Sequence, residues 1–151
     1  MVNIIQFLRK ILGLDFPRSK GTIYITETAS ILKTACKTDN VYISDLYLNM
    51  TTKEEAERFS KQTQISSVEY TESSHDCENF SFALMGYWSQ DLISFTFGLA
   101  MSDNHAFNIF IDNQKKVWVV EPQTNEYMTL AQARVKQRPD MHYFPMKLVW
   151  M

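Results

Sequence analysis

The sequence predicts a single α+β domain that spans residues 1–151. Residues at helical spacing after Cys77, among them Phe80 and Leu84, predict an amphipathic helix. Residues 105–112 and 116–121 instead alternate as strands do, and they are close enough together for a hairpin. No repeat, linker or low-complexity segment divides the chain, so one domain with helices and strands is the simplest interpretation.

Composition supports a folded globular protein, because 45% of the residues are hydrophobic and 13% are aromatic. A formal net charge of −2 offers no electrostatic reason to expect nucleic acid or an anionic membrane as a partner. No apolar run approaches the roughly 18 residues of a membrane span. Two cysteines, Cys36 and Cys77, do not make a disulfide framework, which favours a reducing, cytoplasmic location.

Residues 1–14 are expected to form an amphipathic N-terminal helix. Its apolar face comprises Ile4, Ile5, Leu8, Ile11 and Leu12. The basic residues follow the apolar block instead of preceding it, which is not the pattern of a cleavable signal peptide. We expect the helix to pack on the domain. The alternative is contact with a partner or a membrane surface, since Phe7 and Leu14 widen the apolar stripe.

Short elements are predicted between this helix and Cys77. Residues 22–26 and 41–44 read as strands, and residues 28–37 as a helix. Residues 67–70 read as another short strand or as an extended lead into the Cys77 loop. Thr52 and Glu55 have the three-residue spacing of a capping box, in which each side chain satisfies the backbone amide of the other. They predict a helix that continues to about residue 62.

The second half of the chain has clearer patterns. Residues 77–90 are predicted to be helical, with Ser74 or Asp76 as the N-cap. A strand over 95–101 and the hairpin of 105–112 and 116–121 follow. Thr129 is placed to cap a short helix through residue 136, and residues 147–151 form a last strand.

Cys77 is the residue with the strongest chemical signal. At the start of a helix its sulfur lies in the positive field of the peptide dipoles, which favours the nucleophilic thiolate. Polar residues surround Cys77, whereas Cys36 has the setting of a small buried hydrophobe. Glu72, Asp76 and Glu78 oppose the effect of the helix, because their negative charge disfavours a second anion nearby.

His105 and Glu121 are predicted to share one face of the hairpin. A turn with an odd number of residues keeps them on the same face: three residues place them directly opposite, and five place them diagonally. The other residues of this face are apolar, so we expect it to cover the core against which the Cys77 helix packs.

A cysteine, a histidine and an acid in this order predict a catalytic triad. The thiolate attacks, the imidazole holds and moves the proton, and the carboxylate orients the imidazole. Each residue also has a structural alternative, since His105 could be a satisfied side chain at a strand and Glu121 could simply end one. A zinc site is disfavoured, because no C-x-x-C or H-x-x-x-H spacing occurs.

Three segments resemble the papain-like cysteine peptidase family. They are Asp76-Cys77-Glu78-Asn79-Phe80, Asn104-His105-Ala106-Phe107-Asn108 and Trp118-Val119-Val120-Glu121-Pro122. The form they resemble is the C-terminal domain of the Marasmius mushroom agglutinin, together with small phage and bacterial proteins. The second strand pair is also similar to transglutaminase-like folds. The resemblance implies an α+β fold in which the cysteine-bearing helix packs on a small antiparallel sheet, with Cys77 as nucleophile, His105 as base and Glu121 as orienting acid.

The resemblance has two departures that affect the site. The family places an oxyanion-hole glutamine shortly before the cysteine, and residues 70–75 contain none. The backbone N–H of Cys77 would act with another donor, for which Gln123 and Asn104 are the candidates. The agglutinin domain depends on calcium, and Glu72, Asp76 and Glu78 are the residues that could bind it here. No other cofactor is expected.

The sequence therefore predicts a cysteine-dependent hydrolase or acyl-transferase that acts on an amide bond through a thioester. Its expected form is a thiol protease with a peptide or protein substrate. The alternative is a papain-like interaction module without catalysis, such as a phage structural or host-interaction protein. Rapid labelling of Cys77 near neutral pH, with Cys36 unreactive, would favour the enzyme.

Overall fold

A six-stranded mixed sheet forms the centre of the computed structural model, which describes residues 15–71, 76–90 and 93–151. Its strands run in the order β2-β8-β4-β5-β6-β7. The bounds are β2 Val41–Tyr42, β8 Leu148–Trp150, β4 Phe97–Met101, β5 Ala106–Ile111, β6 Val117–Glu121 and β7 Glu126–Thr129. β2 pairs with β8 in parallel, and the other neighbours pair antiparallel. A separate antiparallel pair joins β1, Gly21–Tyr24, to β3, Tyr47–Met50.

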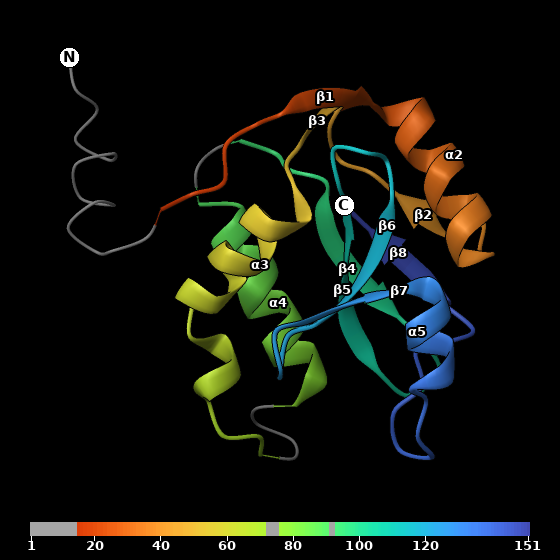
Figure 1. Ribbon diagram of the computed structural model, residues 1–151. Coiled ribbons are helices and arrows are strands. Elements are labelled where there is room, and N and C mark those ends of the chain that lie inside the picture. The colour runs from red at the N-terminus through yellow and green to blue at the C-terminus, as the bar shows by residue number, and fades with distance from the viewer. Residues whose placement is uncertain (1–14, 72–75, 91–92) are drawn as a thin grey trace.

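Helices cover both faces of the large sheet (Figure 1). Two of them, α3 (Lys53–Gln62) and α4 (Cys77–Trp88), lie on one side. The other side carries α2 (Ile25–Cys36) and α5 (Leu130–Val135). Among the described residues no helix has the length and apolar character that crossing a bilayer requires.

The alternation of β5 divides the buried side chains between the two faces. Phe107 and Ile109 belong to the cluster on the α2 and α5 side, together with Leu32 and Tyr143. Phe110, the next residue after Ile109, belongs to the cluster on the α3 and α4 side. That cluster also holds Phe59, Phe80, Leu84 and Trp88. Every residue of β5 is buried, as expected for a central strand that is covered on both faces.

The predicted fold class was wrong. A papain-like or transglutaminase-like domain with a small antiparallel sheet was expected, and the chain instead forms a six-stranded mixed sheet between two helical layers. The parallel pair explains part of the error. It places Val41 beside Val149 and Tyr42 beside Trp150, and in each pair the two residues are separated by more than half of the sequence. Strands β3 and β7 were also missed.

Other local predictions had mixed outcomes. No strand forms at 67–70: a short 3-10 helix, Ile65–Ser67, ends there, and Val68 after it is extended, in keeping with the alternative of an extended lead. Thr52 does cap α3, since its hydroxyl accepts from the N–H of Glu55, but the carboxylate of Glu55 binds the N–H of Arg18 and the hydroxyl of Thr51. The helix after Cys77 and the helix capped by Thr129 both form. Residues 1–14, predicted to be an amphipathic helix, lie outside the described part of the chain.

A cysteine, a histidine and a glutamate at one end of the sheet: candidate functional site

Cys77 is the first residue of α4 and is partly exposed. Asp76 caps this helix, as one of the two predicted candidates. Its Oδ1 accepts from the N–H of Asn79 at 3.3 Å, and Oδ1 of Asn79 accepts from the N–H of Asp76 at the same distance. This reciprocal cap fixes the start of the helix and therefore the position of the thiol.

His105 lies immediately before β5, next to the thiol. Its Nε2 is 2.8 Å from Oε2 of Glu121, and both side chains are buried. The thiol of Cys77 is hydrogen-bonded to the His105 ring. Since Glu121 occupies Nε2, Nδ1 is the nitrogen left to face the sulfur. The N–H of Ala106 also points to Sγ, at 3.4 Å. The structure therefore brings Cys77, His105 and Glu121 together.

The hairpin register places His105 and Glu121 on one face of the sheet. Ile111 pairs with Val117, so the turn comprises the five residues 112–116, and the two site residues are diagonal neighbours. Five is one of the two odd numbers of turn residues that were expected to keep both side chains on one face. The expectation that the Cys77 helix packs on the same face was wrong, because α4 lies on the opposite face with Phe110. Cys77 reaches His105 at the end of the sheet, where its first helical turn meets the start of β5.

Glu121 is held by two further donors that the sequence did not suggest. The hydroxyl of Tyr143 donates to Oε2 at 3.0 Å, and the N–H of Gln123 donates to Oε1 at 3.2 Å. Tyr143 is fully buried, and its ring contacts His105 edge-on, with 5.4 Å between ring centroids. No motif marks Tyr143, which follows Glu121 by 22 residues and reaches the site through the fold alone.

The cluster shifts the pKa values of its thiol and imidazole in opposite directions. The hydrogen bond from His105 is the main cause that lowers the pKa of Cys77. Burial opposes this shift, the Ala106 N–H adds to it, and the charge of Glu78 opposes it. Burial alone would lower the pKa of His105. Its bonds to Cys77 and Glu121, together with their charges, outweigh burial and raise that pKa to about 9. These directions favour a thiolate beside an imidazolium near neutral pH.

The other cysteine has the opposite environment. Cys36 is 1% exposed in the core, and burial raises the pKa of its thiol to about 12. It is therefore protonated at neutral pH and shielded from reagents. The prediction that Cys36 is a small buried hydrophobe is confirmed, and it serves as an internal reference for Cys77.

Asn108 ties α4 to the sheet beneath the site. Its Nδ2 donates to the carbonyl of Ser81 in α4 and to the carbonyl of Gly98 in β4, each at 3.0 Å. The hydroxyl of Ser81 in turn bonds the carbonyl of Cys77 at 2.7 Å. A continuous set of hydrogen bonds therefore connects the sheet with the residue that carries the thiol.

The remaining predicted site residues have other visible partners or lie outside the described residues. Oδ1 of Asn104 accepts from the N–H of His142 at 3.1 Å, so this side chain holds the loop before Tyr143. Gln123 contributes its backbone N–H to Glu121. Of the calcium candidates, Asp76 caps α4, Glu78 is exposed, and Glu72 lies outside the described residues. Within the described ranges no three His, Cys, Asp or Glu side chains are grouped closely enough to bind a metal.

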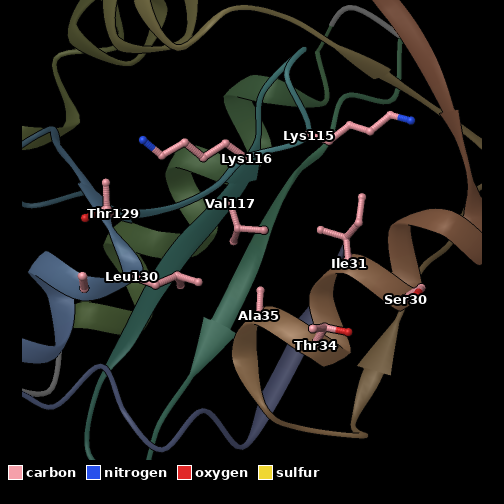
Figure 2. A pocket seen from close by; sticks show the side chains of 10 residues that line it. Ser30, Ile31, Thr34, Ala35, Lys115, Lys116, Val117, Thr129 and Leu130 are labelled. Atoms are coloured by element: carbon pink, nitrogen blue, oxygen red, sulfur yellow. The ribbon is translucent and has the colours of Figure 1, made fainter.

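The largest described pocket lies away from this cluster. It measures about 570 Å³ and is bounded by α2, the start of β6 and the start of α5. Figure 2 shows Ile31, Ala35, Val117 and Leu130 around this hollow, with the ammonium groups of the neighbouring lysines directed away from it. It is wide open and its lining contains no cysteine, histidine or carboxylate, so it offers no comparable cluster.

Comparisons with known proteins show a likeness of fold. One matching solved structure is described as a PSL1a–E64 complex. It superposes on this chain with a TM-score of 0.68 and 16% sequence identity, and the match covers 86% of this chain and 51% of the other. Another is the Polyporus squamosus lectin bound to the human-type influenza-binding epitope Neu5Acα2-6Galβ1-4GlcNAc. Its TM-score is 0.67 at 16% sequence identity, and the match covers 86% of this chain and 49% of the other. This chain thus spans about half the length of each. No family model and no curated protein matches it.

These matches correct the family and function expected from the sequence. One of the matching structures is named as a lectin, and neither description names a papain-like peptidase. The assignment as a hydrolase or thiol protease that cleaves amides is therefore withdrawn, and so is the alternative of a papain-like phage or host-interaction module. Short motifs around Cys77, His105 and Glu121 produced that assignment, and such motifs define a site more closely than they define a family.

Proposed function

We propose that this chain carries a nucleophilic thiol site, in which Cys77 forms a covalent bond with an electrophilic carbon of a ligand. The observation that carries the proposal is the hydrogen-bonded series from the Cys77 thiol through His105 to Glu121. Each of the three residues has a distinct role in it, as nucleophile, proton holder and orienting acid.

The first step follows from the charges of the pair. The proton of the thiol passes to His105, and the imidazolium is stabilised by the carboxylate of Glu121. The thiolate sulfur then supplies the electron pair for the new S–C bond, and the bond to the leaving group on that carbon breaks with its own pair. His105 is the group positioned to protonate this leaving group.

Covalent labelling tests the proposal directly. Full-length protein is treated near neutral pH with a limiting amount of iodoacetamide, and the modified cysteine is identified by peptide mass. We expect label on Cys77 and none on Cys36, whose thiol is buried. E64, the compound named with one of the matching structures, serves as a second probe with the same mass measurement.

A His105→Ala variant is the matched control. It keeps Cys77 and the cap of α4 but removes the partner that lowers the pKa of the thiol. Labelling should slow by about tenfold or more at neutral pH, since one unit of pKa changes the thiolate fraction tenfold. Equal labelling rates in the wild type and the variant would refute the proposal.

Glycan binding is a second candidate, favoured by one observation. A structure of the same fold is described as a lectin with Neu5Acα2-6Galβ1-4GlcNAc bound, and we infer a carbohydrate partner in place of the peptide expected from the sequence. Titration of this trisaccharide into the full chain, followed by calorimetry, tests it. Saturable heat would support a carbohydrate partner, and no heat at millimolar sugar would exclude this one.

A further inference from the structure

The turn that carries His105 is closed by a serine hydroxyl. Met101 at the end of β4 pairs with Ala106 at the start of β5, so residues 102–105 form a four-residue turn. The N–H of Ser102 donates to the carbonyl of His105 at 2.9 Å, and the N–H of His105 donates to Oγ of Ser102 at 3.1 Å. Both backbone polar groups of His105 are therefore bound to Ser102, which fixes the point from which the imidazole extends.

The same hydroxyl reaches a second segment of the chain. It donates its proton to the carbonyl of His142, in the segment between α5 and β8. Oδ1 of Asn104, which belongs to the same turn, accepts from the N–H of His142 at 3.1 Å. The turn thus binds both backbone polar groups of His142, and it thereby holds the next residue, Tyr143, beside the cluster.

These contacts complete a closed circuit around the site. It runs from the Ser102 hydroxyl to His142 and along the backbone to Tyr143. The hydroxyl of Tyr143 donates to Oε2 of Glu121 at 3.0 Å, and this oxygen is 2.8 Å from Nε2 of His105. The N–H of His105 returns the circuit to Ser102. Each bond restrains its neighbours, so the loss of one member loosens the others.

The imidazole of His105 needs this restraint because its partners come from different elements. Cys77 begins α4, Glu121 ends β6, and Tyr143 lies in the segment before β8. The imidazole can bond the thiol and the carboxylate together only if its own backbone is fixed between them. A displacement of about 1 Å would lengthen one of these bonds beyond hydrogen-bonding range.

We propose that Ser102 is a positioning residue for His105: its hydroxyl holds the turn that carries the imidazole against the segment that carries Tyr143. The inference rests on the proposed thiol site and adds a residue that acts through His105. The role requires a group that accepts from one N–H and donates to one carbonyl simultaneously. A threonine hydroxyl can do this and an alanine methyl cannot.

Two readouts on the full-length protein test this role. One is the pH titration of the His105 imidazole by nuclear magnetic resonance, with His75→Gln and His142→Gln variants to assign the signals of the three histidines. The other is the rate at which iodoacetamide labels Cys77 at pH 7.

Ser102→Ala should change both readouts. The bonds to Cys77 and Glu121 raise the pKa of His105 to about 9, so loosening them should lower that pKa. The pKa of the Cys77 thiol should rise in turn, because the bond from His105 is the main cause that lowers it. We expect a shift of about half a unit or more in each, which slows labelling by about threefold or more.

Matched variants separate positioning from stability. Ser102→Thr keeps the hydroxyl and should restore both readouts. Ser89→Ala removes a hydroxyl that donates to the carbonyl of Met85 at 3.0 Å, at the end of α4 remote from Cys77, and should change neither readout. If Ser102→Ala does not fold, Asn104→Ala carries the test, since this exposed residue binds the other backbone group of His142. It should move both readouts in the same direction.

A wild-type pKa of His105 in folded Ser102→Ala protein would overturn the proposal, even if that variant unfolds more readily in urea. Unchanged readouts in Asn104→Ala would overturn it where Ser102→Ala does not fold. The proposed thiol chemistry fails separately, if labelling of Cys77 does not depend on His105. In that case the titration of His105 still decides the role of Ser102.

Discussion

Tyr143 donates its buried hydroxyl to the same carboxylate oxygen of Glu121 that pairs with Nε2 of His105. The carboxylate is therefore fixed from two directions, while the N–H of Gln123 holds its other oxygen. Burial and the charge of Glu121 raise the pKa of Tyr143, so its hydroxyl keeps its proton and acts as a donor throughout the neutral range. Tyr143 is thus a positioning residue for the acid of the cluster.

Replacing Tyr143 with Phe should lower the free energy of unfolding by about 1–3 kcal/mol, because a buried carboxylate loses a donor. Urea unfolding measures this change. Tyr127→Phe is the control, since its hydroxyl pairs with Ser60 at 2.8 Å, away from the cluster. Tyr143→Phe should also shift the pH midpoint of Cys77 alkylation, and Tyr127→Phe should not. Equal midpoints in both variants would mean that Tyr143 has only a structural role.

Replacing Glu121 with Gln should weaken the thiolate as well. Without the carboxylate the pKa of His105 falls from about 9, the imidazolium is less populated, and the pKa of Cys77 rises toward its ordinary value. We expect the alkylation midpoint to move upward by about one unit or more. The measurement is the alkylation rate as a function of pH, with circular dichroism to check the fold. A midpoint that stays in place would remove Glu121 from the proposed site.

Asn108 should matter for both stability and reactivity. Asn108→Ala removes the two bonds from its amide to the carbonyls of Ser81 and Gly98 and leaves a void beneath α4. Together these losses should lower the free energy of unfolding by about 2–4 kcal/mol, as denaturant titration would show. Because Ser81 also bonds the carbonyl of Cys77, we expect slower alkylation at pH 7 in the folded variant. Wild-type alkylation with reduced stability would contradict the link between Asn108 and the thiol.

Two glycines offer a matched pair that tests the packing of the sheet. A Cβ at Gly98 would lie 2.1 Å from the carbonyl oxygen of Trp150, so Gly98→Ala should disrupt the pairing of β4 with β8. We expect a loss of about 3 kcal/mol or more, or no folded protein. A Cβ at Gly86 in α4 meets nothing within 4 Å, so Gly86→Ala should stabilise by about 0.5–1 kcal/mol. Thermal melts of both variants check this, and equal effects would contradict the register.

The sequence predicted the local elements of the second half well, because their signals are local. The cap of α4 at Asp76, the hairpin and the helix capped by Thr129 each depend on residues within a few positions of one another. The sheet order depends on pairs far apart in the chain, such as Val41 with Val149, and no local pattern contains that information. The mixed sheet was missed for this reason.

The candidate site shows the same division. Cys77, His105 and Glu121 could be selected because residue type, helix start and strand parity constrain them. Tyr143 could not, since it reaches Glu121 only after the chain has passed through β7 and α5. The family assignment failed because motifs of a few residues describe only a local arrangement. The matching solved structures share the fold over most of this chain at only 16% sequence identity, so their likeness is not visible in short motifs.

The pH dependence of Cys77 alkylation tests the central claim most directly. It is measured with iodoacetamide in Cys36→Ala protein and in the same protein with His105→Ala. The rate follows the thiolate, so its midpoint reports the pKa of Cys77. We predict a midpoint below the ordinary value of 9.0 with His105 present and a return toward that value without it. A midpoint at or above 9.0 in the protein that retains His105, or identical midpoints in the two proteins, would contradict the account of Cys77 as an activated nucleophile.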